Sequence, residues 1–116
     1  MSANKGWIGV DLDGTLAEWT EWKGVEHIGD PIPRMLARVK GWMRMGIPVK
    51  IFTARVCDGD PRGCRQHIEA WCVKHGIGGL EVTNVKDFNM VELWDDRAVA
   101  VEHNTGCVLG GRSNFQ

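Results

Sequence analysis

The chain has 116 residues, of which 43% are hydrophobic and 25% are charged, close to the values of an average globular protein. This length suits one domain around one hydrophobic core and is too short for two. Its 14 basic and 15 acidic residues give a net charge of -1, which excludes a general electrostatic attraction to nucleic acids or anionic membranes.

The apolar residues form no run of the roughly eighteen needed to cross a membrane, and the first residues, MSANKGW, lack the apolar stretch of a signal peptide. We therefore expect a cytoplasmic protein with no membrane partner. The four cysteines form no C-x-x-C pair, so free thiols are expected rather than a disulfide framework. One alternative is a zinc module built on Cys57, Cys64, His67 and Cys72.

The first predicted element is a buried strand at residues 7–12, WIGVDL. An amphipathic helix is expected next. Asp30 and Pro31 have the character of an N-cap and a first helical position, and apolar residues then recur every three or four positions until Gly46.

VKIF, at residues 49–52, is predicted to be a second buried strand. Asp60 and Pro61 repeat the signal for the start of a helix, and an apolar stripe continues from there to about His75. A second helix is therefore expected to follow the second strand.

The last third of the chain is predicted to hold two further strands, at residues 80–85 and 90–94. Residues 98–106 could form a short helix or a strand, and we favour the helix. A fifth strand is expected at residues 107–109, and the tail from Gly110 is expected to be mobile.

This alternation of strands and helices predicts an α/β fold with right-handed crossovers. The expected architecture is Rossmann-like and three-layered, with a central parallel sheet of about five strands and helices on both faces. No internal repeat or linker interrupts the sequence, so residues 1–116 are predicted to form a single domain.

Polar side chains follow three of the predicted strands at the point where each strand ends. Asp11 and Asp13 end the first strand, and Thr53 ends the second. Asp95 and Asp96 follow the fourth. Because ligands of an open parallel sheet bind beyond the carboxyl ends of its strands, these groups are expected to converge there. Crowded carboxylates repel one another unless a cation compensates them, and oxygen ligands are those that Mg²⁺ prefers.

Four motifs resemble those of the haloacid dehalogenase-like (HAD) phosphohydrolases. They are VDLDGTL, the strand-ending Thr in IFTAR, the Lys in NVKD, and the acidic pair in ELWDDRA. In order and spacing they cover about residues 7–101. No insertion is large enough for a cap domain, so the chain resembles a capless member. The run DDRAV is also similar to the phosphatase domain of polynucleotide kinase-phosphatases.

The resemblance implies a catalytic role for four residues. Asp11 would be the nucleophile, which forms an aspartyl-phosphate, and Asp13 would act as general acid and then general base. Thr53 would hydrogen-bond the transferring phosphoryl group. Lys86 would balance the charge of the nucleophile and the phosphate.

The resemblance also implies a Mg²⁺ site and a phosphate site. Asp11, Asp13 through its main-chain carbonyl, and Asp96 would hold the metal, while Asp95 would bind it or orient its waters or Lys86. The residues expected to contact the substrate or its phosphate are Gly14, Thr53, Ala54, Arg55, Lys86 and Arg97.

The expected function is that of a Mg²⁺-dependent phosphatase acting on a phosphomonoester. Residues 17–29 correspond to the family's small mobile flap, in which Trp19 and Trp22 would either stack on a substrate ring or pack the flap against the body. An open cleft without a cap admits a small phosphorylated metabolite, a nucleotide or a nucleic-acid end.

Simpler interpretations exist for each motif. Asp and Gly are common in turns after strands, Thr53 suits a strand for its β-branched shape alone, and Lys86 has the composition of a solvated loop residue. The alternative function is a non-catalytic module of the same fold, which binds a metal and an anion without turnover.

Overall fold

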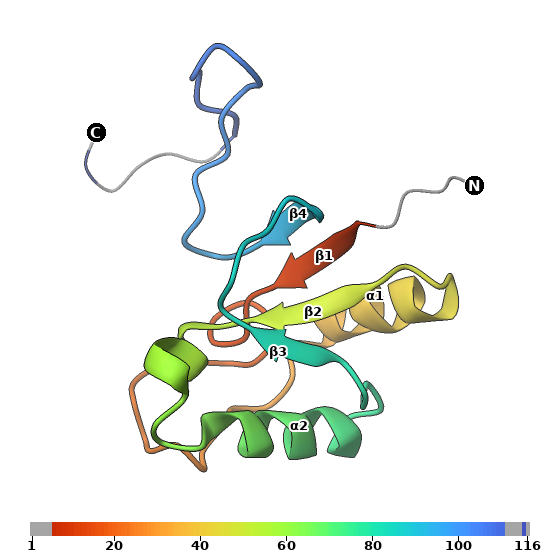
Figure 1. Ribbon diagram of the computed structural model, residues 1–116, viewed down its shortest axis with the longest axis vertical. Coiled ribbons are helices and arrows are strands. Elements are labelled where there is room, and N and C mark those ends of the chain that lie inside the picture. The colour runs from red at the N-terminus through yellow and green to blue at the C-terminus, as the bar shows by residue number, and fades with distance from the viewer. Residues whose placement is uncertain (1–5, 111–114, 116) are drawn as a thin grey trace.

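The computed structural model describes residues 6–110 and 115 and contains four strands and two α-helices (Figure 1). The strands are β1 (Trp7–Val10), β2 (Val49–Phe52), β3 (Glu81–Thr83) and β4 (Met90–Trp94). The helices are α1 (Pro33–Arg44) and α2 (Cys64–Lys74), and an irregular 3₁₀ segment, η1 (Ala54–Gly59), joins β2 to α2. No helix in the described part of the chain is both long enough and apolar enough to cross a membrane.

The strands form one parallel sheet in the order β3-β2-β1-β4, which confirms the predicted parallel α/β architecture. Val10, in the central strand β1, pairs with Ile51 on one side and with Trp94 on the other. All four strands therefore present their carboxyl ends at the same edge of the sheet.

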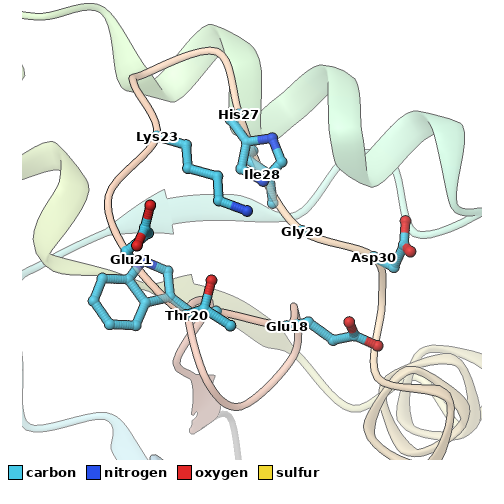
Figure 2. Close-up of a pocket in the computed structure, with 9 residues that line it drawn as sticks. Glu18, Thr20, Glu21, Lys23, His27, Ile28, Gly29 and Asp30 are labelled. Carbon is cyan, nitrogen blue, oxygen red and sulfur yellow. The ribbon is translucent and has the colours of Figure 1, made fainter.

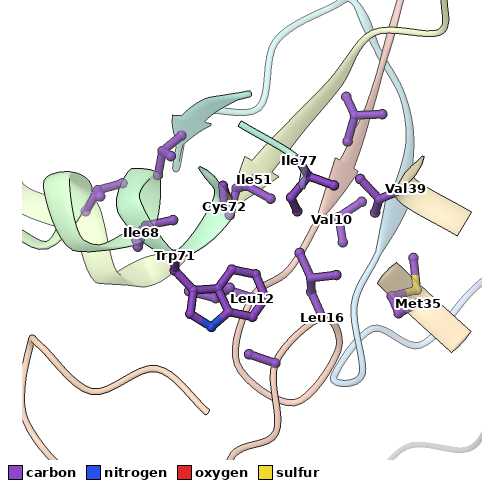
Figure 3. Close-up of a cluster of buried hydrophobic side chains, with 14 of the residues drawn as sticks. Val10, Leu12, Leu16, Met35, Val39, Ile51, Ile68, Trp71, Cys72 and Ile77 are labelled. Carbon is purple, nitrogen blue, oxygen red and sulfur yellow. The ribbon is translucent and has the colours of Figure 1, made fainter. Parts of the chain in front are cut away.

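Both helices pack against the same face of the sheet. Strand residues that alternate onto this face, such as Val10, Ile51 and Val82, belong to one hydrophobic cluster with side chains of both helices, including Val39 and Ile68 (Figure 3). The steps β1 to β2 and β2 to β3 run in the same direction across the sheet. Right-handed crossovers therefore place α1 and α2 on one side.

The opposite face carries no helix among residues 6–110, so the predicted three layers with helices on both faces are not found there. Instead residues 84–89 run from β3 back to β4 without a helix. Asp87 in this connection accepts a hydrogen bond of 2.9 Å from Trp7 Nε1. Trp7 is 3% exposed and contacts Phe52, with the Lys50 ammonium 4.5 Å from its ring centre. The connection is too short to cover the face with a helix.

Both helices begin later than predicted. Pro31 pairs with Ala17 in an isolated bridge, and α1 starts two residues further on with Ile32 at its N-cap. Asp60 does cap α2, although from outside the first turn: its carboxylate accepts hydrogen bonds from the backbone N–H groups of Cys64 (2.7 Å) and Arg65 (3.0 Å).

After β4 the chain leaves the sheet as an exposed arm, residues 97–110, shown in blue in Figure 1. Neither the helix predicted at 98–106 nor the fifth strand at 107–109 forms; an isolated antiparallel bridge joins Val101 to Val108 instead. Gly106 has a positive φ of 79°, as a turn between two short extended stretches requires. Of the tail predicted to be mobile, residues 111–114 and 116 lie outside the described residues.

Candidate active site

Three carboxylates meet where β1 and β4 end, side by side. Asp11 follows β1, and its backbone N–H donates a 2.9 Å hydrogen bond to the carbonyl of Trp94. Asp95 and Asp96 follow β4 directly. One oxygen from each of the three carboxylates lies within 4.8 Å of the others. The predicted convergence of acids from distant segments is therefore present in the structure.

The turn after Asp11 ties the two sides of this carboxylate cluster together. The Thr15 hydroxyl lies 3.2 Å from Asp11 Oδ2 and 3.3 Å from Asp96 Oδ1, and it accepts a 2.9 Å hydrogen bond from the backbone N–H of Asp96. Gly14 has a φ of 91°, and a Cβ atom at this position would lie 2.5 Å from Asp96 Oδ2. Only glycine allows Asp96 to approach this closely.

The cluster raises the pKa of Asp11 from 3.8 to about 7. Burial is the largest cause, because it disfavours the charged form, and repulsion from Asp95 is the second. Contact with the Asp96 carboxylate raises the pKa further, and the hydrogen bond from Thr15 lowers it. A bound cation would offset this repulsion, and oxygen-only donors suit a hard divalent ion such as Mg²⁺.

Asp13 is close in sequence to this cluster but its carboxylate has a different partner. Arg55 binds it with two hydrogen bonds, from Nε to Oδ2 at 2.7 Å and from Nη2 to Oδ1 at 2.9 Å. The Asp13 side chain is therefore not part of the group of carboxylates that could share a metal. The predicted metal ligand at this residue was its main-chain carbonyl, which this ion pair leaves free.

Thr53 directly follows β2 and is 3% exposed. Its backbone N–H donates to the carbonyl of Thr83, and its hydroxyl oxygen accepts a 3.1 Å hydrogen bond from the backbone N–H of Arg55. The hydroxyl hydrogen remains available to a ligand. Thr53 is also the N-cap of η1, and its backbone is extended at this point.

A cleft of about 790 Å³ opens above this edge, and most of the predicted site residues line it. These are Asp11, Asp13, Gly14, Thr53, Ala54, Arg55, Asp95, Asp96 and Arg97. Lys86 is the exception: it is exposed on the connection to β4 and does not line the cleft. That connection has to return to the other end of the sheet, so it leaves the carboxyl edge after Asn84.

The predicted flap, residues 17–29, is a loop that is closed at its base. Glu18 N–H donates to the carbonyl of Asp30 at 2.8 Å, and Trp71 Nε1 on α2 donates to the carbonyl of Gly29 at 3.0 Å. Within the loop lies a smaller pocket of about 230 Å³ lined by both acidic and basic side chains (Figure 2). Trp19 and Trp22 are 44% and 48% exposed and line the larger cleft, where they could contact a substrate.

The residues of the alternative zinc module do not assemble. Cys64 and Cys72 are buried and Cys57 is exposed, and all three are free thiols. Among residues 6–110 the three aspartates form the one group of side chains placed to share a metal ion. Burial raises the pKa of the Cys72 thiol to about 11, so it does not supply a thiolate ligand at neutral pH.

Two residues at or beside the cleft had no predicted role. Thr15 belongs to the VDLDGTL motif, but its bridging of Asp11 and Asp96 depends on how β4 pairs with β1. Arg62 also lines the cleft, and its guanidinium carbon lies 5.9 Å from the centre of the Trp22 ring. No sequence pattern signals that contact, because the two residues come from separate loops.

No family model, no curated protein and no solved structure matches this chain. What can be said of its function therefore depends on the motifs and on the geometry of the cleft.

Proposed function

We propose that this protein is a Mg²⁺-dependent phosphatase of the HAD type, without a cap domain, that hydrolyses a phosphomonoester through an aspartyl-phosphate on Asp11. One observation carries the proposal. The Asp11, Asp95 and Asp96 carboxylates, from two strands far apart in the sequence, lie within 4.8 Å of one another in a cleft that Thr53 also lines. A solvated turn or an ordinary strand end would not need this convergence.

The residues present fit a Mg²⁺ ion. Asp11 and Asp96 supply carboxylate oxygens, Asp95 supplies a third, and Gly14 leaves the space that Asp96 occupies. A bound Mg²⁺ would neutralise negative charge on the carboxylates and on the phosphoryl group. The Asp13 carbonyl is a further proposed ligand.

In the first step a carboxylate oxygen of Asp11 forms a bond to phosphorus while the bond from phosphorus to the ester oxygen breaks. Asp13 gives its proton to the departing oxygen, so that an alcohol leaves. The Thr53 hydroxyl donates a hydrogen bond to the phosphoryl group. Because this side chain is buried and fixed by Arg55 N–H, its orientation is set before the substrate arrives.

In the second step the Asp13 carboxylate takes a proton from a water molecule. The water oxygen attacks phosphorus, the bond to Asp11 breaks, and inorganic phosphate leaves. Asp13 is then protonated and Asp11 is free, as the next turnover requires.

The positive charge that balances the phosphate is assigned here to arginines. Arg62 and Arg97 line the cleft and are the arginines proposed for this role, whereas Arg55 lines the cleft but is bound to Asp13, and Lys86 does not line it. The proposed charge-balancing role of Lys86 would need the exposed connection between β3 and β4 to move toward the cleft. A Lys86→Ala variant with wild-type turnover would assign this role to the arginines.

The proposal is tested by a panel of phosphomonoesters assayed with and without Mg²⁺. The panel contains an aryl phosphate, sugar phosphates, nucleoside monophosphates, and oligonucleotides with 5′- or 3′-terminal phosphates. We expect release of inorganic phosphate only with Mg²⁺ and none from Asp11→Asn. Turnover that persists in Asp11→Asn would rule out the nucleophile proposed here.

Within this panel, nucleotides and nucleic-acid ends form the finer proposal. The cleft is open and has two half-exposed indoles, Trp19 and Trp22, on which a base could stack. Preference for phosphorylated oligonucleotides over sugar phosphates would support this substrate class.

The second candidate, a non-catalytic metal- and anion-binding module, is favoured by one observation: both carboxylate oxygens of Asp13 are engaged by Arg55. Such a module would bind Mg²⁺ and inorganic phosphate in calorimetry, yet release no phosphate from any ester of the panel.

A further inference from the structure

Arg55 lies between the flap and Asp13 and contacts both. Its side chain is 6% exposed. Toward the catalytic edge, Nε and Nη2 hold the two carboxylate oxygens of Asp13. Toward the flap, Nη2 also donates a 3.1 Å hydrogen bond to the carbonyl of His27, and the guanidinium carbon lies 5.0 Å from the centre of the Trp22 ring.

This arrangement is not optimal for stability alone. Arg55 Nη1 is buried and has no hydrogen-bond partner among the described residues. A buried donor without a partner costs roughly 1–3 kcal/mol, and the large majority of buried polar groups in native structures have one. A smaller or apolar residue would leave the Asp13 carboxylate without its partner, so what the arginine provides at this position is its contact with Asp13.

The fork fixes the orientation of one carboxylate. Two parallel hydrogen bonds from a guanidinium define both the position and the plane of the group they bind, which a lysine ammonium cannot do. The Asp13 side chain still has 22% of its surface exposed, so it is held in place and remains open to the cleft.

We infer that Arg55 is a positioning residue that aims the Asp13 carboxylate at the leaving oxygen, and that the flap acts on Asp13 through Arg55. This inference rests on the proposed function. Asp13 has no hydrogen bond to the flap itself among the described contacts, so Trp22 and His27 affect proton transfer only by holding the guanidinium.

The inference makes a prediction that a role in phosphate binding or in folding does not make. Proton donation matters for an alkyl phosphate, whose alkoxide is a poor leaving group, and matters little for p-nitrophenyl phosphate, whose phenolate leaves unaided. General acid catalysis contributes about 10²–10⁴-fold, and misplacing the acid should lose part of that factor. Loss of Arg55 should therefore be selective for the alkyl ester.

The experiment compares kcat/KM for the two esters in the full-length wild type and in Arg55→Lys. This parameter reports the steps up to release of the alcohol. We expect Arg55→Lys to lose about 10–100-fold on the alkyl phosphate and less than about threefold on the aryl phosphate. Trp22→Leu, which removes the ring but keeps Arg55, should show the same selectivity to a smaller extent and should add nothing to Arg55→Lys.

Arg38→Lys is the matched control, because Arg38 also lies over a tryptophan, 5.3 Å from the centre of the Trp94 ring, but does not line the cleft. Its ratio of the two kcat/KM values should equal that of the wild type. Equal losses on both esters in Arg55→Lys, or a loss confined to KM, would overturn the inference and make Arg55 a phosphate ligand or a folding residue. A wild-type protein inactive on both esters would overturn the proposed function itself, and the role of Arg55 with it.

Discussion

The two halves of the carboxylate cluster are built very differently. Asp11, the carboxylate that follows β1, is flanked by the hydrophobic core. Every residue of β1 is buried, and Leu12, between Asp11 and Asp13, is fully buried. Asp95 and Asp96, the carboxylates that follow β4, are attached to an edge strand that has no buried residue. Leu93 in this strand is 37% exposed. Asp11 is thus fixed by packing, whereas Asp95 and Asp96 are placed by the pairing with β1 and by Thr15.

If the protein is the phosphatase proposed above, this contrast separates two tasks of its site. The nucleophile has to be rigid, because a small misplacement of the attacking atom costs much of the rate. The remaining ligands have only to complete the shell of an ion that tolerates water ligands. The core supports the first task, and the edge strand is sufficient for the second.

The largest expected effect is on turnover. Asp11→Asn should reduce kcat by about 10³-fold or more, because the amide cannot attack phosphorus. Asp96→Asn should instead raise the Mg²⁺ concentration for half-maximal activity by about 10–100-fold and leave much of the activity at saturating metal. Titrating Mg²⁺ at fixed aryl phosphate measures both. If the two variants behaved alike, the two halves would not have separate tasks.

The next largest expected effect is on stability. It compares one leucine beside β1 with one leucine in β4. Leu12→Ala should lower the free energy of unfolding by about 2–5 kcal/mol, because it leaves a cavity in the core. Leu93→Ala removes the same atoms from a partly exposed site, so its loss should be below about 1 kcal/mol. Urea denaturation of both variants without metal measures the difference. Equal losses would mean that β4 is as well packed as β1.

Thr15 joins the two halves, and its removal should weaken metal binding. Thr15→Val keeps the shape of the side chain and loses the hydroxyl, so Asp96 is no longer held beside Asp11. We expect the Mg²⁺ affinity to fall about tenfold in calorimetry, which corresponds to about 1.4 kcal/mol. Thr15→Ser keeps the hydroxyl and should retain most of the affinity. An unchanged affinity in Thr15→Val would show that β-sheet pairing alone places Asp96.

An effect of similar size to the last is a pH dependence of stability without metal. The pKa of Asp11 is about 7 in the folded protein and 3.8 in the unfolded chain, so folding favours the protonated form. Stability should therefore fall as the pH rises from about 4 to 8, with Asp11 contributing about 1–2 kcal/mol after solvent screening of a half-buried group.

Denaturation at pH 5 and pH 8 in a chelator measures this change. Asp11→Asn serves as its control, because the amide does not titrate and should be less sensitive to pH over the same range. A wild type and an Asp11→Asn variant with the same pH dependence would contradict the raised pKa of Asp11.

The sequence predicts the sheet well and its surroundings less well. The runs at 7–12 and 49–52 contain β1 and β2: every residue of WIGV is buried, and VKIF alternates buried with partly exposed residues, both of which suit an inner strand of a parallel sheet. The arm after β4 was wrongly predicted as a helix and a strand. Its residues AVAV suit a helix or a strand equally well. The choice between them depends on tertiary contacts, which the sequence pattern does not reveal.

The candidate site also has residues whose positions the sequence predicts and residues whose positions it does not. Asp11, Asp95 and Asp96 could be placed together because parallel strands bring their carboxyl ends to one edge. The position of Lys86 could not, since it depends on the path of a connection with no helix to define it. Nor could the pairing of Arg55 with Asp13, which depends on how a loop folds over the sheet.

Gly29, at the base of the flap loop, limits how this cleft can change through evolution. A side chain there would collide with the carbonyl of Glu18, so the loop's neck tolerates no substitution without being rebuilt. In the tip, residues 19–26, the exposed residues other than Trp22 have no such limit, whereas Gly24 has a φ of 104°, Val25 packs against the core and Trp22 contacts Arg55. Substitutions at those unconstrained positions can therefore change the rim that meets a substrate without touching the residues proposed for catalysis, and a library randomised there, with Trp22, Gly24 and Val25 kept, would sample new specificities in folded proteins.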